Sequence, residues 1–428
     1  MVYNIKNIER RDSMAFQPKN TPQMQGDDPR QALARADRRK RRLQILAPIF
    51  SFVLVGAAAA ALVLSLQAQK NPKPAPQATE PPVVEHTPHD LTVVHLAAAG
   101  DLNVTERVVG LGGDYTDTFL DVAPILSQAD ITALNFEGGL YGEPYGEDAS
   151  APATMAQALK NAGVDIVQLA NSYTIYQGTA GLASTVNGMT EAGLTPIGAW
   201  ANTAAAKTAG GYTLCEVKGI KIAFVAFTKG MDGMALPKGS EGCVNLLYTD
   251  YASAYQKINT EGITAVLNAV AQEAPDITVA MLHWGSEYND TISTSQTKIV
   301  ELLQENGVDA IIGSHSHFVQ QMTFDPATGH FVAYSLGDFL GNADRAGTEY
   351  SVILDLEITK NNTTGHTQIT NFSYTPIYTV TDGNAPRVMR IDTTMKAYEG
   401  GYIARVSSAT YDSMKYAWNR IRARIVGE

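Results

Sequence analysis

Cysteine is scarce in this chain, because two cysteines in 428 residues cannot hold a fold of this length together. Charged residues make up 18% of the chain and apolar residues 45%, which excludes a wholly disordered, collagen-like or disulfide-scaffold protein. The sequence has no evident internal repeat, Ser-His-Asp triad, Gly-x-Ser-x-Gly elbow or phosphate-binding loop with Gly-Lys-Ser/Thr. These absences argue against serine hydrolases and nucleotide-hydrolysing enzymes.

Positive charge is scarce in most of the chain, whose formal net charge is −11. Residues 1–42 hold 11 Lys and Arg against 5 Asp and Glu, which leaves 21 against 38, a net charge of −17, for residues 43–428. A body this acidic argues against nucleic acid as the main partner. The length allows one large domain with appendages or two medium domains.

One long apolar run lies near the N-terminus. The 22 residues 45–66 carry no charge, and a helix of this length can cross the ~30 Å hydrocarbon layer. The five basic residues 38–42 precede this run, and the positive-inside rule keeps them in the cytoplasm. We predict a cytoplasmic tail (1–42), a transmembrane signal anchor (43–66) and an extracytoplasmic C-terminal part, hence a single-pass protein of the cell membrane. A cleaved secretory signal is the alternative, disfavoured by the 42 residues before the apolar core.

A linker and one large domain are expected after the anchor. Residues 67–90 include six prolines and little apolar material, so we predict an extended spacer that holds residues 91–428 away from the membrane. Cys215 and Cys243 then lie on the oxidising side of the membrane. They form either a disulfide that closes a loop of about 28 residues or two buried free thiols.

After residue 90, apolar runs alternate with stretches of helical spacing, which predicts an α/β fold. The predicted strands are 91–98, 131–134, 164–169, 220–227, 277–282 and 308–312, and the predicted helices are 117–129, 154–162, 179–192, 251–274 and 293–306. Three later strands, 330–336, 350–358 and 367–374, are expected to pair antiparallel and complete a second sheet. A last helix, 409–425, is expected to pack on the outside.

Polar residues follow five of the predicted strands, where α/β folds place their ligands. Carboxylate, amide and imidazole groups at successive strand ends are the ligands of a two-metal hydrolytic site that uses Mn, Fe or Zn. We expect His315 and His317 to reach a common centre because residues i and i+2 lie on the same side of an extended chain. The predicted ligands of one or two ions are Asp101, Glu137, Asn171, His283, His315 and His317.

Other side chains near these strand ends are expected to contact substrate: Asn103, Trp284 and Tyr288. Glu287 is expected to shape the same pocket and to take part in catalysis. The remaining histidines have simpler interpretations. His95 lies in an apolar strand and is expected to be a hydrogen-bonded core residue, whereas His330 and His366 are expected at the surface.

From about residue 93 to 341, the chain resembles the bacterial capsule-synthesis proteins of the CapA type. These proteins are associated with poly-γ-glutamate, and their domain is related to the calcineurin-like metallophosphatases. The resemblance implies a metallophosphatase-like αββα sandwich with a di-metal site. It is carried by Gly100-Asp101, Asn135-Phe136-Glu137, Leu169-Ala170-Asn171, His283-Trp284-Gly285-Ser286-Glu287-Tyr288, Gly313-Ser314-His315-Ser316-His317-Phe318-Val319-Gln320 and Tyr334-Ser335-Leu336-Gly337-Asp338-Phe339.

The chain departs from the family pattern at the position of a catalytic acid. Where the family usually has Ala-Asn-Asn-His followed by an Asp, this chain has Ser172, Tyr173 and Tyr176. In related metallophosphatases that His protonates the leaving group. Tyr173 can donate a proton, but a phenol with an ordinary pKa near ~10 is a poorer acid at neutral pH. The later Leu-Gly-Asn-Phe of the family also has Asp338 in place of its Asn.

Three functions remain open from the sequence. The first is a membrane-anchored, metal-dependent hydrolase or transferase that acts on a capsule or wall polymer such as poly-γ-glutamate. The second is a non-catalytic subunit that binds the growing polymer or its membrane synthase, in which a bound metal would offset the repulsion between the acidic body and a polyanion. The third is a structural component of the envelope with a vestigial site.

Overall fold

The structure is a computed structural model that describes residues 90–109, 113–341, 345–381, 385–402 and 406–427. The predicted cytoplasmic tail, the signal anchor and all but the last residue of the predicted linker lie outside the described residues. Within the part of the chain that is described, no helix is both long and apolar enough to cross a membrane.

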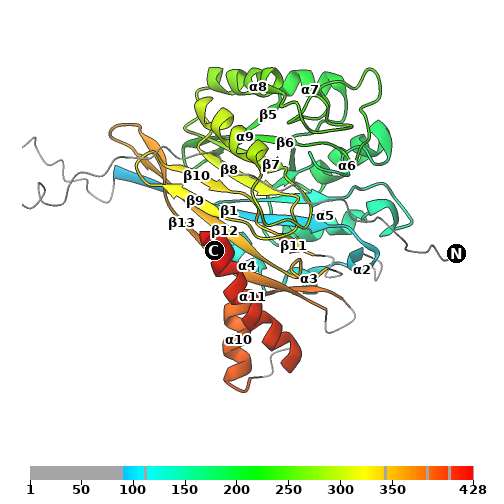
Figure 1. Cartoon of the computed structure of the whole chain (residues 1–428), viewed down its shortest axis with the longest axis vertical. Helices are drawn as coiled ribbons and strands as arrows, with labels where there is room; N and C mark the ends of the chain where they lie inside the picture. The colour runs from blue at the N-terminus through cyan, green and yellow to red at the C-terminus, as the bar shows by residue number, and fades with distance from the viewer. Residues whose placement is uncertain (1–89, 110–112, 342–344, 382–384, 403–405, 428) are drawn as a thin grey trace, which may run out of the picture. The chain divides into compact units, whose positions relative to one another are not determined.

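The first sheet has eight strands: β1 (Leu91–Asn103), β2 (Ile131–Glu137), β3 (Ile166–Gln168), β4 (Thr195–Ile197), β11 (Asp338–Leu340), β12 (Tyr350–Asn361), β13 (Thr367–Val380) and β14 (Arg387–Arg390). Strand β1 pairs in parallel with β2, and β3 and β4 continue the parallel half. On its other edge β1 pairs antiparallel with β12, which leads to β13 and β14, while the short β11 runs parallel to the end of β1 (Figure 1).

The second sheet has six strands: β5 (Tyr212–Val217), β6 (Ile220–Thr228), β7 (Ile277–His283), β8 (Ala310–Ser314), β9 (Met322–Asp325) and β10 (His330–Ala333). Strands β6, β7, β8 and β10 are parallel neighbours, and β5 and β9 close the two edges in antiparallel pairs. Helices lie in the connections from β1 to β2, β2 to β3, β3 to β4, β6 to β7 and β7 to β8, as is usual for parallel neighbours, whereas β8 leads to β10 through the strand β9.

The helices that the structure describes are α2 (Glu106–Val109), α3 (Thr116–Phe119), α4 (Ala123–Gln128), α5 (Ala153–Asn161), α6 (Gly178–Glu191), α7 (Thr203–Ala209), α8 (Thr260–Gln272), α9 (Thr294–Glu305), α10 (Ile391–Glu399) and α11 (Ser408–Val426), with a short 3-10 helix, η2 (Glu147–Ala149). Helix α9 begins with a capping box in which Ser293 and Gln296 exchange hydrogen bonds.

Three apolar clusters divide the domain into layers. Alternate residues of β1 face opposite sides of its sheet, so Val94 and Leu96 pack between the two sheets while Ala97 packs toward the helices α3 to α6. A third cluster lies between the second sheet and the helices α8 and α9. The order is therefore helices, sheet, sheet, helices, which agrees with the predicted αββα sandwich.

Three predictions of secondary structure need correction. Strands β12 and β13 pair antiparallel as expected, but they extend the first sheet, and it is β9 and β10 that complete the second. The helix expected over 251–274 begins only at Thr260, capped by the side chain of Asn259. The helix expected over 117–129 is two short helices, α3 and α4, because Pro124 starts a new helix at its first turn.

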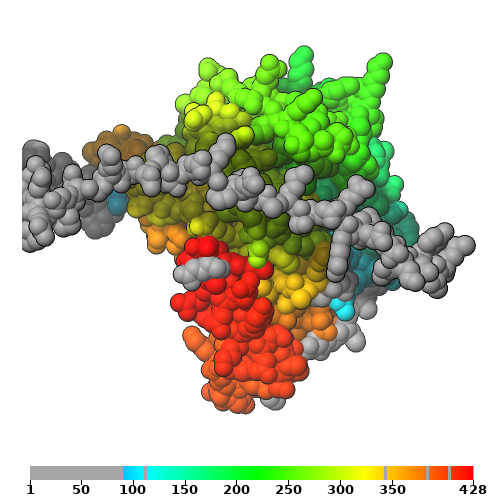
Figure 2. All heavy atoms as spheres, in the orientation of Figure 1, coloured from blue at the N-terminus to red at the C-terminus, as the bar shows by residue number. Residues whose placement is uncertain are grey.

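The last helix, α11, packs against the rest of the domain as expected, and α10 precedes it without having been predicted. Buried residues of α11, including Met414 and Ile421, join the apolar cluster between the sheets. Figure 2 shows α10 and α11, in orange and red, as a projection from the two-sheet body. The predicted outer position of α11 is therefore correct, although one of its faces closes the edge of the core.

The cysteines and one histidine differ from expectation. Cys215 and Cys243 are both free, so no disulfide joins them, and Cys215 is half-buried rather than buried. The His95 side chain is 44% exposed and bonds Asp355 through Nδ1 at 3.1 Å, so it is a hydrogen-bonded histidine at the sheet surface and not in the core. The structure leaves His330 half-buried and His366 exposed.

Candidate metal centre

The ends of strands from both sheets meet at one place. Asp101 lies near the end of β1, Glu137 ends β2 and His283 ends β7. The loop after β8 supplies His315 and His317, and β11 begins at Asp338 beside Asp101. Parallel strands bring their carboxyl ends to one edge, and the two sheets bring these two edges together.

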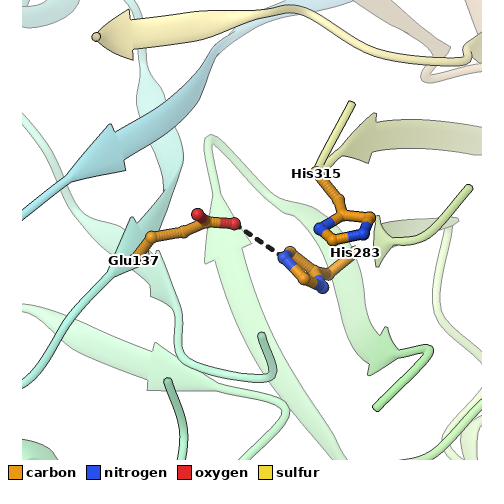
Figure 3. A group of neighbouring side chains, drawn as sticks. All are labelled: Glu137, His283 and His315. Atoms are coloured by element: carbon orange, nitrogen blue, oxygen red, sulfur yellow. Dashed lines mark hydrogen bonds and ion pairs between the residues drawn. The ribbon is translucent and has the colours of Figure 1, made fainter. Parts of the chain in front are cut away.

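One group of possible ligands consists of Glu137, His283 and His315, whose nearest ligand atoms all lie within 4.8 Å of one another. All three side chains are buried. Figure 3 shows them converging, with the Glu137 Oε1 to His283 Nε2 contact of 2.6 Å drawn as a dashed line. The rings of His283 and His315 are neighbours, with centroids 4.2 Å apart.

Thr228 determines which nitrogen of His283 faces this group. The Thr228 hydroxyl donates its one proton to the carbonyl of Gly230, so it accepts a bond from Nδ1–H of His283 at 3.1 Å. Nε2 of a neutral His283 therefore carries a lone pair toward Glu137. Two lone pairs 2.6 Å apart repel unless a proton or a cation lies with them, so this pair holds one or the other.

His315 offers an imidazole nitrogen that nothing else uses. Its Nε2 is buried and has no hydrogen-bond partner among the described residues. The backbone N–H of His315 donates to Oδ2 of Asp101 at 2.9 Å, which fixes the loop. The backbone φ values of His315 (86°) and His317 (59°) are positive, a conformation that costs a non-glycine residue energy and that tends to occur at functional sites. The expectation that these two residues lie on the same side of an extended chain is therefore wrong, and they belong to two neighbouring ligand groups.

The second group consists of Asp101, His317 and Asp338, again with ligand atoms within 4.8 Å of one another and all buried. Nδ1 of His317 lies 2.8 Å from Oδ1 of Asp338 and 3.9 Å from Oδ2 of Asp101. Because Asp101 also bonds the backbone of His315, the two groups are directly connected.

Two asparagines hold the carboxylates of the two groups. The Asn135 amide donates to Asp101 (2.7 Å) and to Glu137 (3.2 Å). The Asn171 amide donates to the Asn135 side chain (3.1 Å) and to the carbonyl of Phe136 (2.7 Å), and its oxygen accepts from the backbone N–H of Tyr173. The structure therefore brings Asn171 to the site as a support of Asn135, and its role as a ligand stays a prediction.

Burial sets the charge states of the carboxyls in the centre. Burial, reinforced by the Glu137 charge, raises the pKa of Asp101 to about 6. Burial raises the pKa of Asp338 to about 7 against the opposing effect of His317. The pKa of Glu137 is also raised, chiefly by burial. The metal-free centre therefore retains protons on carboxyls at a pH where exposed carboxyls have lost them.

The three histidines of the centre differ in pKa because their neighbours differ. Burial lowers the pKa of His283 to about 3 and that of His315 well below its usual value, so both are neutral at pH 7. Burial acts in the same direction on His317, but Asp338 and the other carboxylates outweigh it and raise the pKa of His317 to about 11. The first group thus offers two neutral imidazoles, the form that binds a metal ion.

The residues present fit a divalent metal ion. The unpartnered Nε2 of His315, the lone pair of His283 and the carboxylates around them form a mixed imidazole and carboxylate set, which suits Mn, Fe or Zn. Two adjacent groups of three ligands have room for one or two ions, in agreement with the predicted cofactor.

A cavity of about 440 Å³ opens above the centre. Four residues predicted to contact substrate or shape the pocket line it: Asn103, Tyr173, Glu287 and Tyr288. Trp284 does not, and this prediction is corrected. Its ring is fully buried, stacks on Tyr334 at 5.7 Å and donates its indole N–H to the Tyr334 carbonyl, so it belongs to the core.

Tyr173 keeps its proton. Burial and then the charges of Glu137 and Glu287 raise the pKa of Tyr173 above its ordinary value. The residue is half-buried, and its carbonyl accepts a bond from the hydroxyl of Tyr141 at 2.7 Å. A phenol with a raised pKa is a hydrogen-bond donor and a weak acid.

Sequence reasoning missed Asp338, Asn135, Thr228 and Arg345. Asp338 was seen as a departure from the family pattern, but it begins a strand, so a search of strand ends passes over it. Thr228 ends β6 and could have been found by that search. Arg345 lines the cavity from a loop with no recognisable motif.

The fold and the centre define a two-sheet α/β protein with a buried histidine and carboxylate site at its strand ends. The chain belongs to the family of bacterial capsule synthesis proteins (PGA_cap), whose sequence profile matches residues 95–343. This confirms the resemblance seen in the sequence.

Curated relatives agree. The chain is 26% identical over 270 residues to the capsule biosynthesis protein CapA of Bacillus anthracis, covering 61% of this chain and 62% of that protein. It is 25% identical over 252 residues to the PGA biosynthesis protein CapA of Bacillus subtilis (strain 168), covering 57% of this chain and 62% of that protein. The chain thus spans less than two thirds of the length of the curated relatives it matches.

Solved structures similar to this chain include phosphoesterases. A phosphatase from Mycoplasma pneumoniae has a TM-score of 0.42 at 14% identity and covers 67% of this chain and 94% of its own. A calcineurin-like phosphoesterase from Bacillus subtilis has a TM-score of 0.44 at 15% identity and covers 77% of this chain and 99% of its own.

Proposed function

We propose that this capsule biosynthesis protein binds one or two divalent ions, Mn, Fe or Zn, and uses them to act on an anionic envelope polymer such as poly-γ-glutamate. The observation that carries the proposal is the convergence of two buried ligand groups below a 440 Å³ cavity, one of them with an unused imidazole nitrogen. The action is hydrolysis or group transfer during synthesis, export or processing of the polymer. The polymer class comes from the family resemblance, and it is supported by the name of the Bacillus subtilis relative, a PGA biosynthesis protein.

The residues of the chain divide the work in this proposal. Glu137, His283 and His315 would hold one ion, and Asp101, His317 and Asp338 a second. A bound divalent ion supplies positive charge that polarises a substrate oxygen. Tyr173 donates a hydrogen bond into the cavity, and Glu287 and Asn103 contact the substrate.

The proposed setting is the cell membrane, with the N-terminus in the cytoplasm and the domain outside. It is supported by the uncharged run 45–66 and the basic residues before it. Partners in this setting are the membrane, the polymer and membrane-bound subunits of its synthase, with no role for nucleic acid.

The first test is the metal content of the full chain, purified in detergent without chelator and measured by elemental mass spectrometry. We expect one or two ions per chain. His315→Ala removes a ligand whose nitrogen has no other partner, so it should lower metal retention at least tenfold. His366→Ala, at an exposed position, is the matched control and should retain the wild-type content. Absence of stoichiometric metal after reconstitution with each ion would overturn the proposal.

A second function, non-catalytic polymer binding, is favoured by one observation. Tyr173 stands where the family has its catalytic acid, and its raised pKa makes it a weaker acid still. In this case the ions and the cavity bind the polymer or present it to the synthase without cleaving it.

Tyr173→His separates the two functions. An imidazole at this position would restore a general acid that titrates near neutral pH, an effect worth about 10²-fold or more in rate. If the chain is a hydrolase limited by Tyr173, we expect turnover of poly-γ-glutamate or a phosphoester to rise, with Tyr173→Phe as the control. If metal-loaded wild type and both variants bind the polymer and none cleaves it, the non-catalytic function stands.

A further inference from the structure

Three residues form a stack at the wall of the cavity. The guanidinium carbon of Arg345 lies 4.0 Å from the centre of the Tyr288 ring, a cation–π contact. The ring of His317 also stacks on Tyr288, with centroids 5.0 Å apart and planes 25° from parallel. All three residues line the 440 Å³ cavity. Tyr288 thus contacts both Arg345 and a candidate metal ligand.

The Arg345 side chain forms no salt bridge with a carboxylate of the described residues. The salt bridges of the described chain do not include it, although Glu137, Glu287 and Asp338 line the same cavity. Its backbone is fixed, because the Arg345 carbonyl accepts bonds from the N–H (3.1 Å) and the hydroxyl (2.9 Å) of Thr348. The guanidinium is therefore held over a ring and available to an anion from outside.

Another cationic side chain, Lys229, already has partners. Lys229 donates to the carbonyl of Gly285 at 2.8 Å and lies over the ring of Tyr255, and it does not line the cavity. Against an acidic wall, an anionic ligand needs a positive group to approach, and among the described lining residues Arg345 and His317 are the cationic side chains.

We propose that Arg345, supported by Tyr288, binds a carboxylate of the polymer substrate and so selects a polycarboxylate. This inference rests on the proposed function and names the group that recognises the substrate. A planar guanidinium pairs with a carboxylate through two parallel N–H bonds, and stacking on Tyr288 orients that fork in advance. One carboxylate of the polymer lies on Arg345 while a neighbouring unit lies over the metal centre.

The test is calorimetric titration of a short γ-linked glutamate oligomer into the full chain, loaded with metal in detergent. Arg345→Met keeps the length of the side chain and removes the charge, and we expect at least tenfold weaker binding, or about 1.4 kcal/mol. Arg345→Lys should recover only part of this, because an ammonium lacks the planar fork. The control is Arg422→Met, which removes the same charge from an exposed position on α11 and should bind as wild type does.

A γ-linked glutamine oligomer shows whether the carboxylate is what Arg345 recognises. Wild type should bind the glutamine oligomer more weakly than the glutamate oligomer. Arg345→Met should bind the glutamine oligomer as wild type does, because the change of ligand and the substitution remove the same contact. Metal content is measured for every variant. Equal binding of the glutamate oligomer by Arg345→Met and wild type, both with metal, overturns the role of Arg345 and leaves the proposed function intact. Loss of metal in wild type overturns the proposed function instead.

Discussion

The hydroxyl proton of Thr228 determines the tautomer of His283 and so the chemistry of the first ligand group. Since that proton goes to the carbonyl of Gly230, the imidazole presents a lone pair to Glu137. Such hydrogen bonds behind a metal-binding histidine orient it for the ion. The second group differs, because Asp338, which bonds Nδ1 of His317 at 2.8 Å, is itself a candidate ligand of that group.

Metal binding should depend steeply on pH. An ion displaces the proton of His317, whose pKa is about 11, throughout the range below that value. Below pH 7 and then below pH 6 it also displaces protons from Asp338 and Asp101, because their pKa values are raised to about 7 and about 6. Affinity for an ion at the second group (Asp101, His317 and Asp338) should therefore fall as pH falls, by about tenfold per unit above pH 7 and more steeply below.

Titration calorimetry between pH 5 and 8, in two buffers with different heats of ionisation, counts the protons released by the ion. Asp338→Asn is the informative variant, because an amide does not titrate and the contribution near pH 7 should disappear. An affinity that does not change over this range would show that His317, Asp338 and Asp101 do not give up protons to the ion and so are not its ligands.

The candidate site was predictable from sequence where residues end a strand. Asp101, Glu137 and His283 follow this rule, and the structure places them together. Asp338 does not follow this rule, because it begins a strand. The prediction that Trp284 contacts substrate is wrong because Trp284 follows a strand end but its ring turns into the core. A one-dimensional pattern shows that a residue is near a strand end and does not show the side to which it turns.

Strand β11 reaches the centre because Gly100 lets it approach β1. A Cβ on Gly100 would lie 1.8 Å from the carbonyl oxygen of Gly337, a backbone atom that also accepts the N–H of Asp101. Backbone cannot move aside as a flexible side chain can, so any side chain here would push β11 and Asp338 away from Asp101.

Gly100→Ala should therefore lower the free energy of unfolding by about 3 kcal/mol and reduce metal retention. Gly219→Ala is the control: it lies at a turn with φ 77° and no atom within 4 Å of a Cβ, so we expect only the backbone cost of about 1–2 kcal/mol and full metal content. Urea unfolding with chelator and metal analysis without it measure the two effects. Equal metal content in both variants would contradict the close-approach argument.

The elements themselves were largely predictable, since apolar runs marked β1, β2, β6, β7 and β8 within a few residues. The sheet that each strand after residue 330 joins was not predictable. Strands β12 and β13 join the first sheet because β12 pairs with β1 across more than 250 residues of sequence, and local periodicity carries no information about such a pairing. The break between α3 and α4 was visible in Pro124 and was overlooked.

At the scale of the whole molecule, the net charge of the protein opposes binding of the proposed substrate. Residues 43–428 carry a net charge of −17, yet the proposed substrate is a polyanion. On the proposed function, attraction is therefore local, at Arg345 and the candidate metal centre, while the rest of the surface repels the polymer. Repulsion between distant charges is screened by salt, with a Debye length of about 30 Å at 0.01 M and about 8 Å at 0.15 M, whereas contacts inside the cavity are screened less.

The association rate of a γ-linked glutamate oligomer with the metal-loaded chain should accordingly rise, by about tenfold, as salt increases from about 0.01 to 0.15 M. A protein that captures a polyanion on a basic surface shows the reverse. Stopped-flow fluorescence measures the rate, and the uncharged glutamine oligomer should show no salt effect. A peptide of residues 1–42, which carries a net charge of +6, is measured alongside, because its binding should weaken with salt. If the full chain slows as the peptide does, that basic segment and not the cavity captures the polymer.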